Sequence, residues 1–423
     1  MADSQINQSA QYEIQSLIIY KTNVEVDVRS IFIEMNIYDS IFTNSISGNL
    51  IIVDSLGVLR GFKFDGSEYL IVKMSKSGNL FPYEKVFHIY KQSKRDILTY
   101  GSESYVLDFI SDEYTVSEQT RVAQHYEDTY SNIAKLILKN YLRVLPIKLK
   151  GVIDDSQGVR SVIIPTIKPL DAITWCSKRA LDKQGKPTFL FFENNDGFNF
   201  TTTSNIFKQT PLININFSPK NIVNDINQEF FGVRAFEVID QYDFIDNTKS
   251  GVYAKTGRFY DIINRTFKEI RTNYTQDQNG VDSANPKKNG VIPKTSRFNL
   301  NPDEAYYSKI ESYFYNSKPT GNEETPDKWI LQRESIMQNL FAKKVRVVMA
   351  GNFGLTSGKT SRVIAPKFSV RTGNDSTDGI DLTLTGTYLI IATKHTIKSQ
   401  SNDSQQHITT MDLVTDSTLD IKE

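Results

Sequence analysis

The chain of 423 residues contains a single cysteine, Cys176, and four histidines. One cysteine excludes a disulfide within the chain and any metal cluster built from several thiolates. The histidines, His88, His125, His395 and His407, lie on separate segments and lack the paired spacing of the common zinc motifs. We therefore expect no metal site, and we interpret His88 and His395, which lie in strand-like runs, as structural.

The sequence also lacks an excess of charge of either sign and lacks long apolar runs. Lysine plus arginine number 49, as do aspartate plus glutamate, whereas dedicated nucleic-acid binders and polybasic membrane binders carry a basic excess. The N-terminus shows no basic region followed by an apolar run, so we expect no conventional export signal. No apolar run approaches the ~20 residues of a membrane helix. We expect a protein made in a cytoplasm, without direct membrane insertion.

Signals of catalysis are missing as well. The GxSxG elbow of α/β-hydrolases is not present. Cys176 lies on the apolar-flanked face of a predicted helix, which favours a core position over a nucleophile. No pair of carboxylates stands out locally as a glycosidase acid and base, although such pairs can lie far apart in sequence. We expect no catalytic residue, no cofactor and no enzyme activity.

One stretch, GNFGLTSGKT at residues 351–360, resembles a phosphate loop. That motif requires a glycine, four residues and then Gly-Lys-Ser/Thr, and the required glycine position is occupied by Phe353. The residues that follow, SRVIAPKFSV, are typical of an edge or bulged strand rather than a helix. We therefore expect no phosphate and predict a turn between strands, with Gly351, Gly354 and Gly358 at positive φ.

What the chain does contain is a strong β signal. The 25 Phe and 21 Tyr against 2 Trp favour half-buried pleated surfaces. Within residues 12–113, segments such as NVEVDVR alternate apolar and charged side chains, and glycines separate successive segments. This pattern predicts a first antiparallel barrel over residues 12–113, completed by about residues 206–245.

Between these two parts the pattern changes. Residues 131–142 and 170–181 show helical spacing, the second after a proline in the preferred first-turn position. The segment TFLFFENNDGFNFTT predicts a hairpin that turns at residues 195–197. We interpret residues 114–205 as a small α+β domain inserted between barrel elements.

The remainder is divided into two parts. Residues 246–328 contain polar stretches rich in Gly, Asn and Pro, which predict an extended, loop-rich region. Residues 329–423 begin with the helical pattern WILQRESIMQNLFA and continue as a β-meander, which predicts a helix and a second barrel.

The two β regions end alike. The segment LDFISD carries Asp108 and Asp112, and MDLVTD carries Asp412 and Asp416 in the same places. A duplicated barrel explains this match. The alternative is that strands commonly end in aspartate before a loop. The overall prediction is a mainly β, α+β protein with two similar antiparallel barrels.

The order of these parts resembles the central baseplate hub protein of contractile-tailed, T-even-type phages. The resemblance rests on successive segments that together cover most of the chain outside the polar region at residues 247–302. They are YDSIFTNSISGNLIIVDSLG, IPTIKPLDAITWCSKRA, PTFLFFENNDGFNF, QRESIMQNLFAKKVRVVMAGNFGLTSGKTSRVIAP, GTYLIIATKHTIK and TTMDLVTD.

The resemblance implies two tube-type barrels per chain and a homotrimer whose six barrels form a ring. Such a ring joins a threefold tail spike protein to the sixfold tail tube protein in the virion baseplate. It also implies contacts with baseplate wedge and tape-measure proteins, and DNA in transit through the lumen.

Two alternatives remain open. The first is the hub of a phage-like contractile injection or secretion machine. The second is a carbohydrate-binding or carbohydrate-degrading tail protein, for which an aromatic cluster would supply a sugar platform. Its members are Tyr306, Tyr307, Tyr313, Phe314 and Tyr315.

Overall fold

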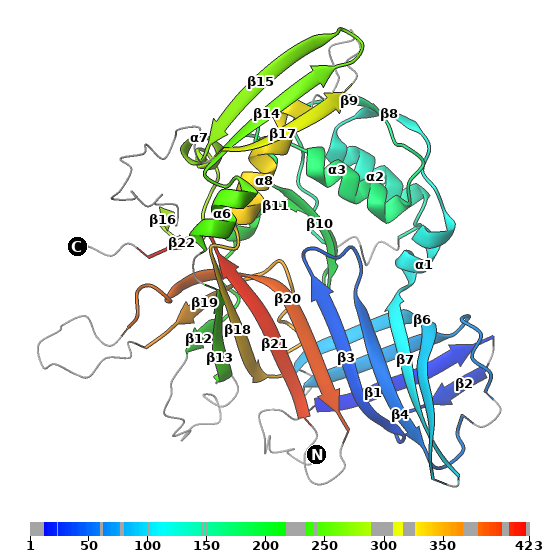
Figure 1. The fold of residues 1–423 in the computed structure, drawn as a ribbon. Coiled ribbons are helices and arrows are strands. Elements are labelled where there is room, and N and C mark those ends of the chain that lie inside the picture. Colours follow the sequence, from blue (N-terminus) through cyan, green and yellow to red (C-terminus); the bar gives the residue numbers. More distant parts are fainter. Residues whose placement is uncertain are drawn as a thin grey trace, which may run out of the picture.

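The computed structural model is mostly β, as predicted, and Figure 1 shows its arrangement. A sheet of 13 strands runs through both β regions. The described residues are 12–22, 24–59, 62–76, 80–99, 101–144, 148, 151–216, 233–240, 243–288, 308–315, 326–366, 380–399 and 406–419.

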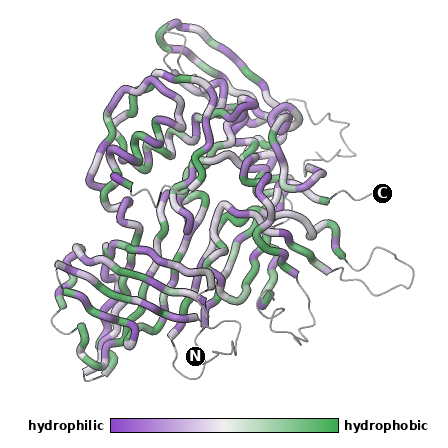
Figure 2. Tube along the Cα trace, turned by 180° about the vertical axis from the view of Figure 1, so that it is seen from behind, coloured by the Kyte–Doolittle hydropathy of each residue, from purple (hydrophilic) through white to green (hydrophobic). Residues whose placement is uncertain are grey.

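The first barrel is formed by seven strands in the spatial order β3-β4-β7-β6-β5-β1-β2. Buried and half-buried side chains alternate along β4 and much of β7. Figure 2 shows hydrophobic and hydrophilic residues interspersed along the strands of the molecule. The sheet curls around one apolar core that includes Leu50, Leu107 and Phe109. The strands are β1 (Tyr12–Lys21), β2 (Val24–Asp27), β3 (Phe32–Ser40), β4 (Ser47–Asp54), β5 (Tyr69–Lys76), β6 (Leu80–Thr99) and β7 (Ser102–Ser111).

The second barrel has its own core, and its strands follow the order β13-β18-β21-β20-β19-β12. The second barrel joins the first directly, because its strand β20 pairs with β3 in one continuous sheet. We call this pairing the seam. The strands are β12 (Asn214–Asn216), β13 (Val233–Asp240), β18 (Lys343–Ala350), β19 (Thr360–Ile364), β20 (Gly386–Lys398) and β21 (Gln406–Thr415).

The prediction that residues 206–245 complete the first barrel is wrong. β12 pairs with β19 and β13 pairs with β18, so both belong to the second barrel. Ile215 and Val233 are buried in the core that contains Val347. Alternation of side chains shows which residues face a core, but it does not show which core.

The two barrels repeat the same strand order, although β1 runs antiparallel to β5 whereas β12 runs parallel to β19. In chain order β1, β3, β4, β5, β6 and β7 correspond to β12, β13, β18, β19, β20 and β21, and this correspondence also reproduces the spatial order. Corresponding pairs share one irregularity each, although β6 and β13 also have register shifts that β20 and β3 lack. β6 has one extra residue, Tyr90, opposite the step from Phe109 to Asp108, and β20 has one extra residue, Ile391, opposite the step from Leu413 to Asp412.

A second shared irregularity lies one strand pair away. Ile33 is the extra residue of β3 against β4, and Arg234 is the extra residue of β13 against β18. Bulges disrupt the ladder at specific positions, so two bulges at matching places indicate a true structural repeat. Asp108 and Asp412 therefore occupy equivalent positions.

The inserted domain agrees with the sequence pattern. Its two longer helices pack on each other around a core that contains Cys176, and the β10–β11 hairpin turns at Asn195 and Asp196. Its elements are α1 (Asp112–Gln119), β8 (His125–Asp128), α2 (Tyr130–Asn140), β9 (Arg160–Ile163), α3 (Pro169–Arg179), β10 (Phe189–Asn194), β11 (Gly197–Thr202) and α4 (Thr203–Phe207).

The region at residues 246–328 is not simply an extended loop. It contains a three-stranded sheet in the order β15-β14-β17, which projects away from the barrels in Figure 1. The buried residues of this sheet lie on the central strand β14, whereas the described side chains of β15 and β17 are half-buried or exposed. The elements here are α6 (Phe244–Ser250), β14 (Ala254–Asp261), β15 (Thr266–Asn273), α7 (Tyr274–Gln278), β16 (Lys287–Lys288), β17 (Ser308–Tyr315) and η3 (Pro326–Lys328).

The predicted helix at the start of the last region is present as α8 (Ile330–Asn339). Its C-terminal end packs on the second barrel through Met337 and Leu340. The short strand β22 (Ser417–Thr418) closes the described chain and pairs with β16. Among the described residues, no helix combines the length and apolar character needed to cross a bilayer.

Candidate functional site at the seam

The loop at residues 351–360 lies between β18 and β19 and reaches the first barrel. The Phe353 ring stacks on His407 of its own barrel, with centroids 4.2 Å apart, and on Tyr83 of the first barrel, with centroids 5.0 Å apart. The Thr356 hydroxyl and the Ser357 N–H both donate to the buried carboxylate of Asp39 on β3. The loop therefore ties the second barrel to the first.

The same loop binds the inserted domain. The Asn195 N–H donates to Thr356 Oγ1 (3.2 Å), and the Asn194 side-chain amide donates to the Ser357 carbonyl (2.9 Å). Lys359 Nζ lies 2.7 Å from Asp196 Oδ2. Three parts of the chain thus meet at one loop, which we call the three-way joint.

The glycines of this loop have different roles from those predicted. Only Gly358 has a positive φ, at 78°, whereas Gly351 and Gly354 do not. Gly351 is required for space, because a Cβ there would overlap the His407 ring. The expected strand after the loop is present, since β19 begins at Thr360, and no helix N-terminus faces the turn.

Buried ionisable groups surround the joint. Asp39 is fully buried, and this burial raises the pKa of its carboxyl, although hydrogen bonds from Thr356 and Thr393 oppose the rise. Burial also raises the pKa of Glu193 and holds the pKa of the Tyr83 phenol well above its usual value. Glu193 Oε2 accepts from the Ile46 N–H at 3.0 Å, so this carboxyl also links the inserted domain to the first barrel.

A histidine pair fills the second barrel beneath Phe353. His395 Nδ1 lies 3.2 Å from His407 Nε2, and His395 Nε2 lies 3.1 Å from the carbonyl of Leu355. Burial lowers the pKa of His395 to about 4 and holds that of His407 well below its usual value. Both rings are therefore neutral packing groups at pH 7, in agreement with a structural role for His395.

The buried carboxyl of Asp39 provides the first test of the joint. Asp39→Ala leaves the Thr356, Thr393 and Ser357 donors without their acceptor, and we expect a loss of about 1–3 kcal/mol in the free energy of unfolding. Asp39→Asn keeps an acceptor oxygen for the Ser357 N–H, so its stability at pH 7 stays within about 1 kcal/mol of the parent. Urea unfolding of both variants measures this difference, and equal losses would contradict the role of the hydrogen bonds.

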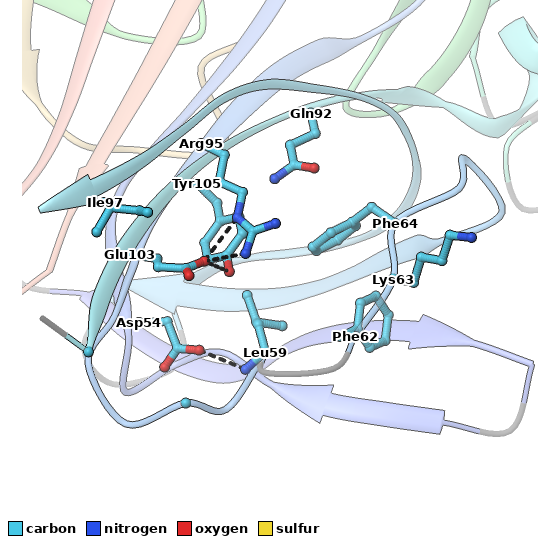
Figure 3. Close-up of a pocket in the computed structure, with 12 residues that line it drawn as sticks. Asp54, Leu59, Phe62, Lys63, Phe64, Gln92, Arg95, Ile97, Glu103 and Tyr105 are labelled. Carbon is cyan, nitrogen blue, oxygen red and sulfur yellow. Dashed lines mark hydrogen bonds and ion pairs between the residues drawn. The ribbon is translucent and has the colours of Figure 1, made fainter.

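A second feature lies at the open end of the first barrel. A cavity of about 700 Å³ is lined by Phe62 and Phe64 on one side and by Arg95, Glu103 and Tyr105 on the other (Figure 3). Arg95 Nη2 lies 2.8 Å from Glu103 Oε2, and the Tyr105 hydroxyl donates to the same oxygen at 2.5 Å. In the second barrel the residues equivalent to Arg95, Glu103 and Tyr105 are packed beneath Phe353. They are His395, His407 and Thr409.

Two strand edges lie open near these features. β5 pairs with β6 only as far as His88, and the residues of β6 from 91 to 98 are exposed. Among the described strands, β13 pairs only with β18. Both edges carry exposed apolar side chains, including Ile97 (77% exposed) and Val238 (37% exposed). Such edges are templates for pairing with another strand.

The four aspartates singled out in the sequence are not brought together into one site. Asp412 accepts from Arg346 Nε at 2.8 Å, and Asp108 accepts from the hydroxyl of Ser93. Asp112 is the first residue of α1 and Asp416 directly follows β21. In the part of the chain that the structure describes, no three His, Cys, Asp or Glu side chains are grouped to hold a metal ion.

The aromatic cluster considered as a sugar platform is only partly described, since Tyr306 and Tyr307 lie outside the described residues. Tyr313 stacks on Phe259 at 5.2 Å. Phe314 meets Tyr260 at an interplanar angle of 70°, so these two rings do not form a flat platform.

Comparison with known proteins shows the fold. A tail protein from Neisseria meningitidis aligns over 96% of this chain and 97% of its own, with 10% identity and a TM-score of 0.51. The 43 kDa tail protein of prophage MuSo2 from Shewanella oneidensis aligns over 95% of this chain and 99% of its own, with 9% identity and a TM-score of 0.53. No family model and no curated protein matches the chain. The chain thus has a phage tail-protein fold, as the resemblance implied.

Proposed function

We propose that this chain is a structural, non-enzymatic hub of a contractile tail. Three copies form a ring of six barrels that joins a threefold tail spike protein to the sixfold tail tube protein in the virion baseplate. Baseplate wedge and tape-measure proteins are the further partners, and DNA passes through the lumen. The tail-protein fold over nearly the whole chain supports this assignment.

The observation that carries the proposal is the repeat together with its open edges. Within one chain the β20 edge of the second barrel pairs with the β3 edge of the first. The edge of β6 is equivalent to that of β20, and the edge of β13 is equivalent to that of β3. These two edges lie at opposite ends of the barrel pair and, among the described strands, are not paired with each other within the chain. A heterologous contact that repeats with a fixed rotation closes into a ring. Two equivalent barrels per chain allow three chains to present six similar surfaces.

Strands β18, β21, β20 and β3 carry charged side chains on the face that points away from the cores. Most of these charges are paired, as expected for a channel through which DNA passes. Arg346 and Lys344 both pair with Asp412, at 2.8 and 3.3 Å, and Lys398 lies 3.6 Å from Glu34. A wall of unpaired lysines and arginines would retain DNA electrostatically. Pairing the cations with carboxylates reduces that attraction, which supports transit over retention.

The two ends of the barrel pair differ in a way that suits two different partners. The inserted domain and the β15-β14-β17 sheet lie beyond one end of the barrels, and the N-terminal strand β1 lies toward the other (Figure 1). A ring with two unlike faces can bind a spike on one and a tube on the other.

The mass of the purified protein tests the proposal. We expect multi-angle light scattering to give about three times the 48.2 kDa of the chain, alone or after addition of its spike protein. A chain that stays monomeric at all concentrations, with and without the spike, would contradict the hub. The hub of an injection or secretion machine would give the same mass. The genes beside this one distinguish such a machine from a phage tail.

A further inference from the structure

We propose that residues 94–97 of β6 pair with β13 of a second copy in one defined register, and that this strand closes the cavity of the first barrel. The inference rests on the ring proposed above and names the residues of its joint. The occupant is a second copy of this chain, because the chain itself shows how such a joint is built at the seam.

The register follows from the repeat. At the seam, Lys394 lies opposite Tyr38, His395 opposite Ile37, and Thr396 opposite Asn36. Each β20 residue is matched to the β6 residue that has the equivalent neighbour on β7, and each β3 residue to the β13 residue that has the equivalent neighbour on β18. The extra residues Ser93 of β6 and Ile239 of β13 have no counterpart at the seam, so the register steps over them. The corresponding pairs between two copies are Lys94 with Asp240, Arg95 with Val238, and Asp96 with Glu237. The β6 residue belongs to one copy and the β13 residue to the other.

The side chains on the outer face of this joint carry recognisable charges. Lys94 would face Asp240 directly and Glu237 diagonally, within reach of a long side chain. Asp96 would face Glu237, so one directly opposed pair is attractive and the next is repulsive.

The inward side explains the cavity. Arg95 and Ile97 line it, and Ile97 is 77% exposed in the single chain. At the seam, the equivalent inward residues Ile397 and Ile37 are both almost completely buried. Val238 of the second copy would take the place that Ile37 has at the seam, and would lie against Arg95 and Ile97 at the wall of the cavity.

Cysteine pairs test the register. In Asp96→Cys/Glu237→Cys the two thiols face each other only across the joint, so mild oxidation should give covalent dimers and trimers on a non-reducing gel. The matched control is Asp96→Cys/Glu25→Cys, because Glu25 is exposed on β2 at another edge of the same barrel. The native Cys176 is buried and does not interfere. Equal crosslinking of both pairs would overturn the register.

Charge reversal gives a second, non-covalent readout. We expect Lys94→Glu to raise the dissociation constant of the joint about 3- to 10-fold and Asp96→Lys to lower it by a similar factor. Both positions are exposed, so neither change disturbs the core. One outcome would refute this joint and leave the hub intact. In it, rings form, but the cysteine pair does not crosslink and the two charge variants do not change the dissociation constant in opposite directions. Parent chains that never assemble would refute both.

Discussion

Replacing Gly358 by alanine is expected to lower the free energy of unfolding by about 2–5 kcal/mol. Its φ of 78° lies in the left-handed region, where a residue with a Cβ loses about 1–2 kcal/mol. The new methyl would also overlap the ring of Phe192, and overpacking of a well-packed core costs about 1–3 kcal/mol. Since Phe192 belongs to the β10–β11 hairpin, the change separates the loop from the inserted domain at the three-way joint.

Chemical denaturation at pH 7 measures this effect, and Gly185→Ala is the matched control. Gly185 has a similar φ of 75°, but a Cβ there has only the end of the Gln157 side chain in reach, at 3.8 Å. The control therefore carries the backbone cost alone. Equal losses in the two variants would show that the contact with Phe192 does not matter.

Acid is expected to destabilise the second barrel through its buried histidines. The pKa of His395 is about 4 in the folded chain, against an ordinary value of 6.5. As pH falls through 6.5, the unfolded chain takes up protons that the folded chain does not, so stability is lost progressively down to about pH 4. This difference corresponds to about 3 kcal/mol for His395. His407 adds to it, because burial and the neighbouring His395 and Lys76 lower its pKa as well.

The variant His395→Gln tests this prediction. Its amide can donate to the Leu355 carbonyl and removes one titrating group from the barrel. We expect the unfolding free energy of the parent to fall more steeply between pH 6.5 and 4 than that of the variant. The matched control is His125→Gln, which makes the same replacement at an exposed position of the inserted domain. Identical slopes in all three proteins would show that the histidine pair does not titrate on unfolding.

Local patterns in the sequence predict most of the elements. Period-two alternation identifies the strands of the first barrel, helical spacing identifies α2, α3 and α8, and the residues at 195–197 identify the hairpin. The match between LDFISD and MDLVTD indicates the repeat, because these two strands take the same place in each barrel. These signals depend only on residues near each other in the chain.

The parts that could not be predicted depend on distant contacts. Nothing near β13 reveals that it pairs with β18, more than 100 residues later. Asp39 meets Thr356 across 317 positions. The one local signal of this contact is that Asp39 follows Met35 and Ile37 at a spacing of two, on the face that faces the core, because a buried carboxylate requires hydrogen-bond partners. The sheet at residues 254–315 could not be predicted because its strands mix charged and apolar residues and are separated by polar stretches rich in Gly, Asn and Pro.

The seam also has a consequence for how the chain folds during synthesis. The first barrel is complete once residue 111 has emerged, but the β3 edge must wait for β20 at residues 392–398. At ribosomal rates of about 5–20 residues per second, that delay lasts roughly 15–60 seconds. Throughout this interval a long, ordered strand edge is exposed to other nascent chains, and such edges promote aggregation. In the cell, the yield of folded protein should therefore be higher when this strand edge is shielded from other chains until translation ends.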